Sequence, residues 1–262
     1  MEIYAIEITS ECNIRCSYCP QPDMVRKKEH MSLDMFERIL DYPMLFDGVA
    51  GHLFGEAFLH PDLLEMTRLC DLKRIKFGFS TNTLGLDMAY LEKLIDAGLG
   101  WLVISYHIPQ APRIKDQIQK LFPNFPVFTN QLEVKHDWAA QVDANSKANV
   151  KKGVSPRRAL EGDCVFHEFD LVTISAQGDI FACCVDAEGV SNMGSLFQYT
   201  PEEFAALGND RWFSLCDNCH ERNSKEGLQA HIEILKGMAD RVESYKAMDP
   251  FAKQSRYVIS DT

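Results

Sequence analysis

The stretch ITSECNIRCSYCPQP, Ile8 to Pro22, holds three cysteines, Cys12, Cys16 and Cys19. Their spacing, C-x3-C-x2-C, puts them on one turn-rich loop that directly follows an apolar, strand-like opening segment. Three thiols crowded onto such a loop indicate a metal centre rather than buried structural cysteines. A closed tetrahedral site needs four ligands, so the loop raises the question of where the fourth ligand lies.

Two kinds of metal centre fit this loop. Zinc normally takes paired C-x2-C units and a fourth Cys or His, and His30 is the candidate for that position. An iron–sulfur cube instead takes one thiolate per iron, and a loop of this length can wrap one face of the cube. Three thiolates would then leave one iron open to a substrate or cofactor. The spacing alone leaves both alternatives open.

The composition is that of an ordinary globular protein, with 46% hydrophobic and 25% charged residues among 262. A formal net charge of −11 gives no sign of nucleic-acid binding by the surface as a whole. The chain shows no secretory leader and no apolar run long enough to cross a bilayer, so we expect a cytoplasmic protein without membrane contacts. Clustered cysteines in a reducing cytosol are ligands or catalysts more often than disulfides.

Predicted strands and helices alternate over the first 140 residues or so. Strands are expected at 2–9, 74–82, 101–107 and 126–134, with a further one leading into 51–61, and helices at 33–42, 61–73, 87–98 and 113–122. Ser32 is expected to cap the first helix, and Pro61 to lie in the first turn of the second. This rhythm is typical of βαβ units and predicts an α/β fold, a partial (β/α)6 TIM-like barrel. In such barrels the chemistry gathers at the carboxyl ends of the strands.

The rhythm changes in the second half of the chain. After a polar connector at 143–162, the segment 169–184 predicts two strands that turn around Ala176-Gln177-Gly178. A capped helix at 200–208, the pair CDNC at 216–219 and an amphipathic helix at 226–246 follow. We therefore expect two domains, the barrel at 1–145 and a small β-hairpin/helix module with its own metal centre at 146–262.

A second group of cysteines falls in this module. Four thiols would saturate a metal, and a hairpin cysteine with a distal C-x2-C resembles a zinc ribbon. The members of the group are Cys164, Cys183, Cys216 and Cys219. Cys70, in contrast, lies on the apolar stripe of a predicted helix and is expected in the core.

The first cysteine loop resembles the signature of radical S-adenosylmethionine (SAM) enzymes. The match is Cys12-x3-Cys16-x-Tyr18-Cys19. The resemblance implies that the three thiols bind a [4Fe–4S] cluster whose open iron takes the amino and carboxylate groups of SAM. It also implies that Tyr18 lies near the adenine. The missing fourth ligand would then be the functional feature of the site.

Two further segments support the same resemblance. Phe54-Gly55-Glu56-Ala57 is similar to the family's Gly-Gly-Glu-Pro motif, which holds the SAM amino group. Glycine suits close backbone approach, and a carboxylate suits an ammonium partner. The segment Ser80-Thr81-Asn82 matches a polar strand end that approaches the SAM carboxylate or ribose. Ala57 replaces the family's proline, which weakens the rigidity of that loop.

The second cysteine group resembles the Twitch module, a shortened SPASM domain that holds one auxiliary [4Fe–4S] cluster. The resemblance implies that the chain carries two clusters in total. It favours Cys183 over Cys184 as the hairpin ligand, because the module's pattern runs G-x4-C from the turn glycine, here Gly178.

The resemblance extends over nearly the whole chain to radical SAM dehydrogenases that oxidise an alcohol of 2-deoxy-scyllo-inosamine. It implies hydrogen abstraction from a small polar substrate, such as an aminocyclitol, a sugar or a nucleoside-like molecule, and its two-electron oxidation to a ketone. The auxiliary cluster would accept one electron, and a flavodoxin or ferredoxin would be the one-electron donor. Epimerisation, sulfur transfer and peptide modification remain alternatives, as does a non-catalytic zinc-binding protein.

Two residues are candidates for catalysis itself. His107 can accept a proton because its pKa can lie near neutrality. Glu7 would bind a polar substrate if it points into the barrel, and would otherwise be a buried structural partner. An arginine that contacts substrate in the resembling dehydrogenase has no counterpart in this chain. The candidates to replace it are His136, Asp137, Trp138 and Gln141.

Overall fold

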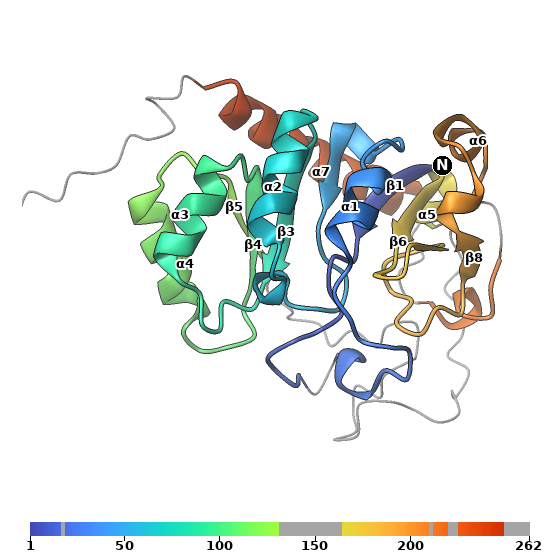
Figure 1. Cartoon of the computed structure of the whole chain (residues 1–262), viewed down its shortest axis with the longest axis horizontal. Helices are drawn as coiled ribbons and strands as arrows, with labels where there is room; N and C mark the ends of the chain where they lie inside the picture. Colours follow the sequence, from blue (N-terminus) through green and yellow to red (C-terminus); the bar gives the residue numbers. More distant parts are fainter. Residues whose placement is uncertain (17–18, 131–163, 210–211, 220–224, 249–262) are drawn as a thin grey trace, which may run out of the picture.

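A computed structural model of the chain describes residues 1–16, 19–130, 164–209, 212–219 and 225–248. At its centre is an eight-stranded sheet in the order β5-β4-β3-β2-β1-β6-β7-β8 (Figure 1). The strands are β1 (Glu2–Ile6), β2 (Gly48–Ala50), β3 (Lys76–Thr81), β4 (Trp101–Ser105), β5 (Val127–Asn130), β6 (Leu171–Ile174), β7 (Asp179–Phe181) and β8 (Asn192–Ser195). Strands β1 to β6 run parallel, and β7 and β8 are antiparallel additions. The predicted α/β class with a partial TIM-like barrel is confirmed.

The helices of the barrel half follow their strands as the sequence predicts. They are α1 (Leu33–Ile39), α2 (Leu63–Leu72), α3 (Met88–Asp96) and α4 (Ala111–Leu121). The side chain of Ser32 caps α1 by accepting a hydrogen bond from the Met35 N–H at 3.2 Å, which confirms that prediction. Pro61 lies outside the first turn of α2, because that helix begins at Leu63. The sequence therefore located each helix, with errors of a few residues at the ends.

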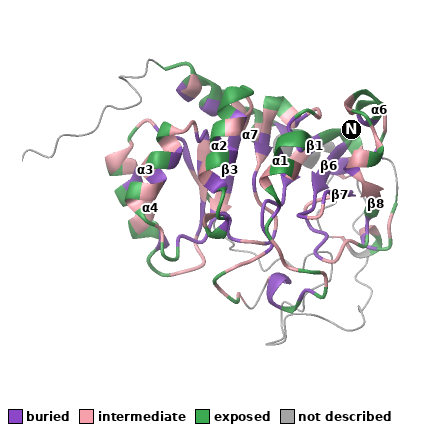
Figure 2. Cartoon of the chain, in the orientation of Figure 1, coloured by how far each residue is buried: buried purple, intermediate pink, exposed green. Residues whose placement is uncertain are grey.

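The hydrophobic core lies between these helices and the sheet (Figure 2). Phe36 of α1 meets Phe77 of β3 edge to face, with ring centroids 5.8 Å apart, and both side chains are fully buried. Cys70 of α2 is fully buried in the same core, as predicted. Close packing on this face holds the carboxyl ends of the strands in fixed positions.

The predicted hairpin is present as β6 and β7, and it extends the barrel sheet. β6 pairs with β1 from Glu2↔Leu171 to Ile6↔Ile174. The remaining helices of the described chain are α5 (Val165–Glu168), α6 (Pro201–Ala205) and α7 (Lys225–Lys246). The proposed domain boundary at 145/146 lies outside the described residues and stays a prediction. One sheet nevertheless joins the two halves of the molecule.

The long helix α7 contacts both halves. Near its middle, Ile232 packs with Val165 and Leu171 of the hairpin side. In its last turns, Tyr245 stacks edge to face on Phe125, with centroids 5.7 Å apart, and Lys246 Nζ donates to the Gly98 carbonyl at 2.6 Å. In the part of the chain that the structure describes, α7 and the other helices are too short or too polar to span a membrane.

Candidate functional site

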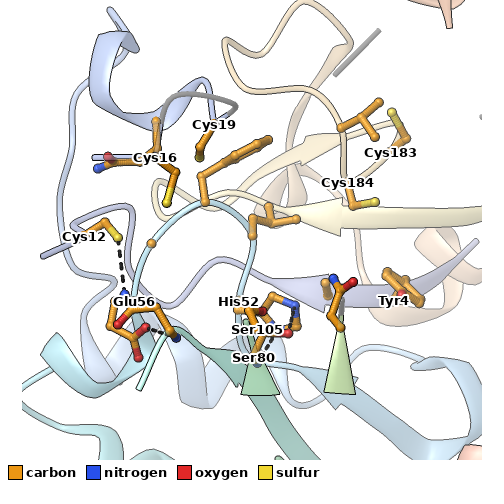
Figure 3. A pocket seen from close by; sticks show the side chains of 18 of the residues that line it. Tyr4, Cys12, Cys16, Cys19, His52, Glu56, Ser80, Ser105, Cys183 and Cys184 are labelled. Atoms are coloured by element: carbon orange, nitrogen blue, oxygen red, sulfur yellow. Dashed lines mark hydrogen bonds between the residues drawn. The ribbon is translucent and has the colours of Figure 1, made fainter. Parts of the chain in front are cut away.

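A cavity of about 420 Å³ lies at the carboxyl ends of β1 to β5 and reaches the hairpin (Figure 3). Cys12, Cys16 and Cys19 form one wall, while Cys183 and Cys184 belong to the opposite wall. Polar side chains from the strand ends lie between these walls, namely His52, Ser80, Ser105, His107 and Asn130. The fold therefore brings the two cysteine groups, far apart in sequence, to a single cavity.

The first cysteine loop is stabilised by a short turn and by one neighbouring amide. The Cys19 N–H donates to the Cys16 carbonyl at 3.2 Å. Asn82 Nδ2 donates to Asn13 Oδ1 at 2.8 Å and lies 3.9 Å from Cys12 Sγ. Burial raises the pKa of the Cys19 thiol to about 12 and also raises that of Cys12. Buried thiols of this kind ionise when they coordinate a metal cation.

Gly55 brings a second loop against the cysteine loop. A Cβ atom at this position would lie 2.1 Å from the carbonyl oxygen of Thr9 and 2.9 Å from that of Glu11. Only glycine permits this approach. The adjacent Glu56 N–H donates to the Glu11 carbonyl at 2.8 Å, which fixes the two loops together.

Glu56 lies at the centre of a buried polar network. Its side chain is 2% exposed and accepts hydrogen bonds from Thr81 Oγ1 at 2.8 Å, the Asn82 N–H at 2.8 Å and the Phe58 N–H at 3.3 Å. Burial raises the pKa of the Glu56 carboxyl above its ordinary value, and these hydrogen bonds oppose that rise. The predicted residues Gly55, Glu56, Thr81 and Asn82 thus form one wall of the cavity.

Ser80 bonds to a different partner, His52, which was not among the site residues predicted from the sequence. The Ser80 N–H donates to His52 Nδ1 at 3.1 Å, and Ser80 Oγ lies 3.0 Å from His52 Nε2. Burial lowers the pKa of His52 to about 4. His52 follows β2 in the segment 51–61, so its place at a strand end was the signal that could have identified it. His107 also lines the cavity, and burial lowers its pKa.

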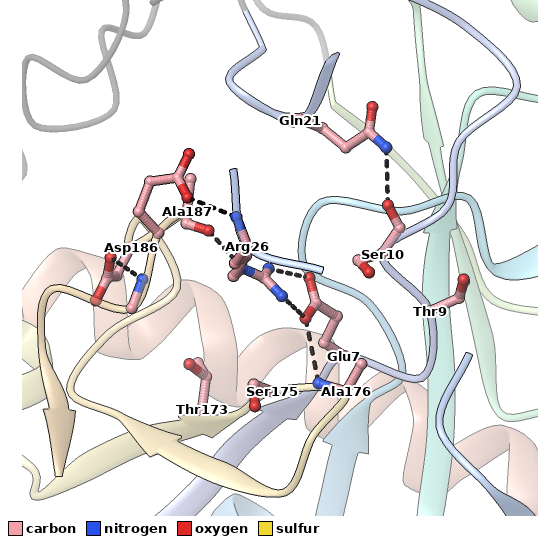
Figure 4. A network of polar contacts seen from close by, with 12 residues as sticks. Glu7, Thr9, Ser10, Gln21, Arg26, Thr173, Ser175, Ala176, Asp186 and Ala187 are labelled. Carbon is pink, nitrogen blue, oxygen red and sulfur yellow. Dashed lines mark hydrogen bonds and ion pairs between the residues drawn. The ribbon is translucent and has the colours of Figure 1, made fainter. Parts of the chain in front are cut away.

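Glu7 is a buried structural partner, the second of the two roles considered for it. Its fully buried carboxylate accepts two hydrogen bonds from Arg26, at 2.6 and 2.7 Å, and one from the Ala176 N–H at 3.2 Å (Figure 4). Glu7 is not part of the cavity wall. Arg26 Nε also donates to the Ala187 carbonyl at 2.5 Å, so the pair joins the segment after the cysteine loop to the hairpin module.

His30, the alternative fourth zinc ligand, does not join the three thiols. Its side chain is exposed, and its ring packs edge to face against His60, with centroids 5.2 Å apart. The cavity wall contains neither ring.

The four cysteines predicted for the second centre surround a small cavity beside the main one. They are Cys164, Cys183, Cys216 and Cys219. Cys183 lines both cavities, whereas its neighbour Cys184 lines the main cavity and not the small one. Asn209 holds the segments around the group, because its Nδ2 donates to the carbonyls of Phe166, Leu171 and Ala182 at 3.3, 2.6 and 2.9 Å.

The two groups of free cysteine thiols are of the kind that ligates iron–sulfur clusters, although their side chains are not yet gathered into a coordination site. None of the nine cysteines forms a disulfide. Over the described ranges, no three His, Cys, Asp or Glu side chains already form a metal-binding group. Cys12, Cys16 and Cys19 line the same cavity as Glu56. Tyr18, His136, Asp137, Trp138 and Gln141 lie outside the described residues.

Comparison with known proteins agrees with this geometry. Residues 6–123 match the model of the radical SAM superfamily. A tungsten-containing aldehyde ferredoxin oxidoreductase cofactor-modifying protein of Pyrococcus furiosus is 30% identical over 111 residues, which is 41% of this chain and 31% of that protein. A PqqA peptide cyclase of Methylobacterium nodulans is 28% identical over 107 residues, which is 40% of this chain and 28% of that protein. The matches thus span about a third or less of these curated relatives.

Solved structures extend the similarity to the whole fold. The crystal structure of BtrN in complex with AdoMet and 2-DOIA superposes with a TM-score of 0.60 and 15% identity, covering 97% of each chain. An open conformation of BtrN gives a TM-score of 0.56 and covers 84% of this chain and 92% of that one. At this identity the likeness concerns the fold alone. Residues 6–123, which include the cysteine loop, thus resemble a radical SAM domain.

Proposed function

We propose that this chain is a radical SAM oxidoreductase that oxidises an alcohol of a small hydroxylated substrate to a ketone. The observation that supports this is the single cavity between the two cysteine groups. Oxidation of a carbinol removes one hydrogen atom, one proton and one electron, so a substrate in this cavity needs an acceptor for each. A [4Fe–4S] cluster with SAM supplies, when bound, the 5′-deoxyadenosyl radical that takes the hydrogen atom.

The residues of the cavity wall around Glu56 are suited to binding the cluster and SAM. Cys12, Cys16 and Cys19 would hold the cluster, and Gly55 would let the backbone approach the methionyl part of SAM. A carboxylate has about four acceptor positions, and three donors occupy part of this capacity at Glu56. The remaining capacity suits an ammonium group.

A cluster held by the cysteines on the opposite side of the cavity would accept the electron from the substrate radical. Cys164, Cys183, Cys216 and Cys219 would hold a second, fully ligated [4Fe–4S] cluster, which is a one-electron acceptor. His107 would take the proton, because burial lowers its pKa and so leaves the imidazole neutral at pH 7. A flavodoxin or ferredoxin stays the predicted donor of the electron that starts each turnover.

The test begins with the protein purified without oxygen. We expect about eight irons and eight sulfides per chain, and reductive cleavage of SAM by the loaded protein. With substrate, one SAM should be consumed for each two-electron oxidation. A protein that carries zinc, or that does not cleave SAM, contradicts the proposal. Four irons, with Cys216 and Cys219 open to alkylation, would contradict the second cluster alone.

Epimerisation is the second candidate, because Cys184 lines the main cavity. Its thiol could return a hydrogen atom to the substrate radical, and the resulting thiyl radical would need one electron from the auxiliary cluster and one proton. The oxidation state of the substrate would not change. In D2O this route places deuterium in the product, and Cys184→Ser stops turnover. Dehydrogenation gives a ketone, and the serine variant keeps it.

A further inference from the structure

The hydrogen bonds between Ser80 and His52 determine which nitrogen of the imidazole carries the proton. Ser80 lies in β3, and its main-chain N–H donates to His52 Nδ1 at 3.1 Å. A nitrogen that accepts a hydrogen bond has no proton, so the neutral ring must carry its proton on Nε2. Nε2 lies 3.0 Å from Ser80 Oγ and therefore donates to it. Burial lowers the pKa of His52 to about 4, which keeps the ring neutral near pH 7.

This arrangement gives the Ser80 hydroxyl a fixed direction. One lone pair of Oγ is occupied by the imidazole, so its own O–H is the group that remains to donate. Ser80 lines the cavity together with Ser105, which lies near it (Figure 3), and Asn130, at the ends of the next two strands. A ligand at this point would meet a donor already oriented by the protein.

The charges of the cavity point to the class of ligand. The described wall contains no lysine, arginine or aspartate. Its carboxylate, Glu56, is held by Thr81, Asn82 and Phe58. At the Ser80 side of the cavity, away from the cysteine loop, a phosphate or carboxylate group would lose its hydration without gaining a cationic side chain, whereas hydroxyl groups can be matched by serine, asparagine and histidine.

We propose that the Ser80 hydroxyl, oriented by His52, donates a hydrogen bond to an oxygen atom of an uncharged polyol substrate at the floor of the cavity. This deepens the proposed function and rests on it for the reaction. SAM also carries oxygen acceptors, in its ribose and carboxylate, and the family resemblance assigns Ser80 to the cofactor. The experiment must therefore separate a polyol from SAM as the source of the oxygen.

Equilibrium dialysis of the full chain, purified without oxygen and with its iron measured, provides the separation. The probes are myo-inositol, as an uncharged polyol, and SAM. Ser80→Ala should weaken myo-inositol binding about three- to tenfold, the range expected for one neutral hydrogen bond, and change SAM binding less than about twofold. Ser80→Thr keeps the hydroxyl and should bind within about twofold of the parent.

His52 is tested as a positioning residue. Glutamine also offers one acceptor and one donor, so His52→Gln should retain most of the myo-inositol affinity, whereas His52→Leu should lose it as Ser80→Ala does. If His52 only stabilised the fold, the glutamine and leucine variants would bind myo-inositol equally well whenever their thermal midpoints are equal. If Ser80→Ala does not fold, the threonine, glutamine and leucine variants still decide the matter.

Three results would overturn the proposal: no saturable binding of myo-inositol by the parent, equal binding by Ser80→Ala, or a selective loss of SAM binding in that variant. The last would assign the hydroxyl to the cofactor. Failure of the proposed function has a different signature, since the parent would then not cleave SAM under reducing conditions, whatever it does with myo-inositol.

Discussion

The two cysteine groups are built in opposite ways. Cys12, Cys16 and Cys19 lie on one loop, which Gly55 and Asn82 contact from other parts of the chain. The second group comes from the start of α5, the end of the hairpin and the loop after α6, and tertiary hydrogen bonds hold those segments together. The first group can be recognised from the spacing of its cysteines in the sequence. The second group, assembled from separate segments, also depends on residues that are not metal ligands.

Loss of a ligand in each group should give the largest and clearest difference. Cys16→Ala should abolish SAM cleavage and remove about four irons per chain, because the first group would no longer hold a cluster. Cys219→Ala should remove a similar amount of iron and keep SAM cleavage, while oxidation of substrate stops. Iron analysis and separate assays of 5′-deoxyadenosine and product decide this. Equal loss of SAM cleavage in both variants would mean that the groups are not functionally distinct.

The next largest effect is expected at the buried Arg26–Glu7 pair, which connects the segment after the first cysteine loop to the hairpin module. Arg26→Ala leaves the fully buried Glu7 carboxylate without its cation, which should cost about 3–5 kcal/mol of unfolding free energy. Arg15→Ala is the matched control, because Arg15 and Asp23 form an exposed pair at 3.6 Å that should contribute less than about 1 kcal/mol. Urea denaturation measures both variants. Similar midpoints would show that the buried pair does not tie the halves together.

Asn209 tests the assembled group directly. Asn209→Ala removes a buried amide that binds three carbonyls, so we expect a loss of about 2–4 kcal/mol and faster alkylation of Cys216 and Cys219. Asn192→Ala, at an exposed position whose side chain accepts a hydrogen bond from the Gly194 N–H, should change neither quantity noticeably. Unchanged alkylation in Asn209→Ala would argue that the second group is as self-contained as the first.

The smallest effect is expected at Glu188. Its carboxylate accepts hydrogen bonds from the N–H groups of Val25 and Arg26, at 3.0 and 3.1 Å, and the side chain is half-buried. Glu188→Gln keeps an acceptor and should be nearly neutral, whereas Glu188→Ala should lose about 1 kcal/mol in the same urea titration. A loss as large as that of Arg26→Ala would mean that this half-buried contact, and not the buried Arg26–Glu7 pair, is the main connection between the two halves.

The sequence was sufficient wherever a feature is local. The helix cap at Ser32, the hairpin turn at 175–178 and the loop spacing of the first cysteines each depend on neighbouring residues. The family resemblance named Glu56, Thr81 and Asn82, and the fold joins these three residues by hydrogen bonds, while their cofactor role stays a prediction.

Features set by long-range pairing were not accessible in the same way. The side of the sheet that Glu7 faces could not be deduced by alternation, because the pairing of β1 with β6 shifts register between Ile3 and Ala5. His52 was missed because its partner, Ser80, lies on another strand. Asn209 carries no motif at all, and only the fold shows that three carbonyls converge on its amide.

The pairing of β1 with β6 also bears on how the chain is made. During synthesis one edge of β1 can pair with β2 early, but the other edge has no native partner until the ribosome has passed Ile174. An unpaired strand edge is a template for another nascent chain. Once it has been made, the hairpin that leads to Cys183 covers this edge of β1 and so shields the barrel from self-association. A chain halted before residue 165 would leave the edge exposed.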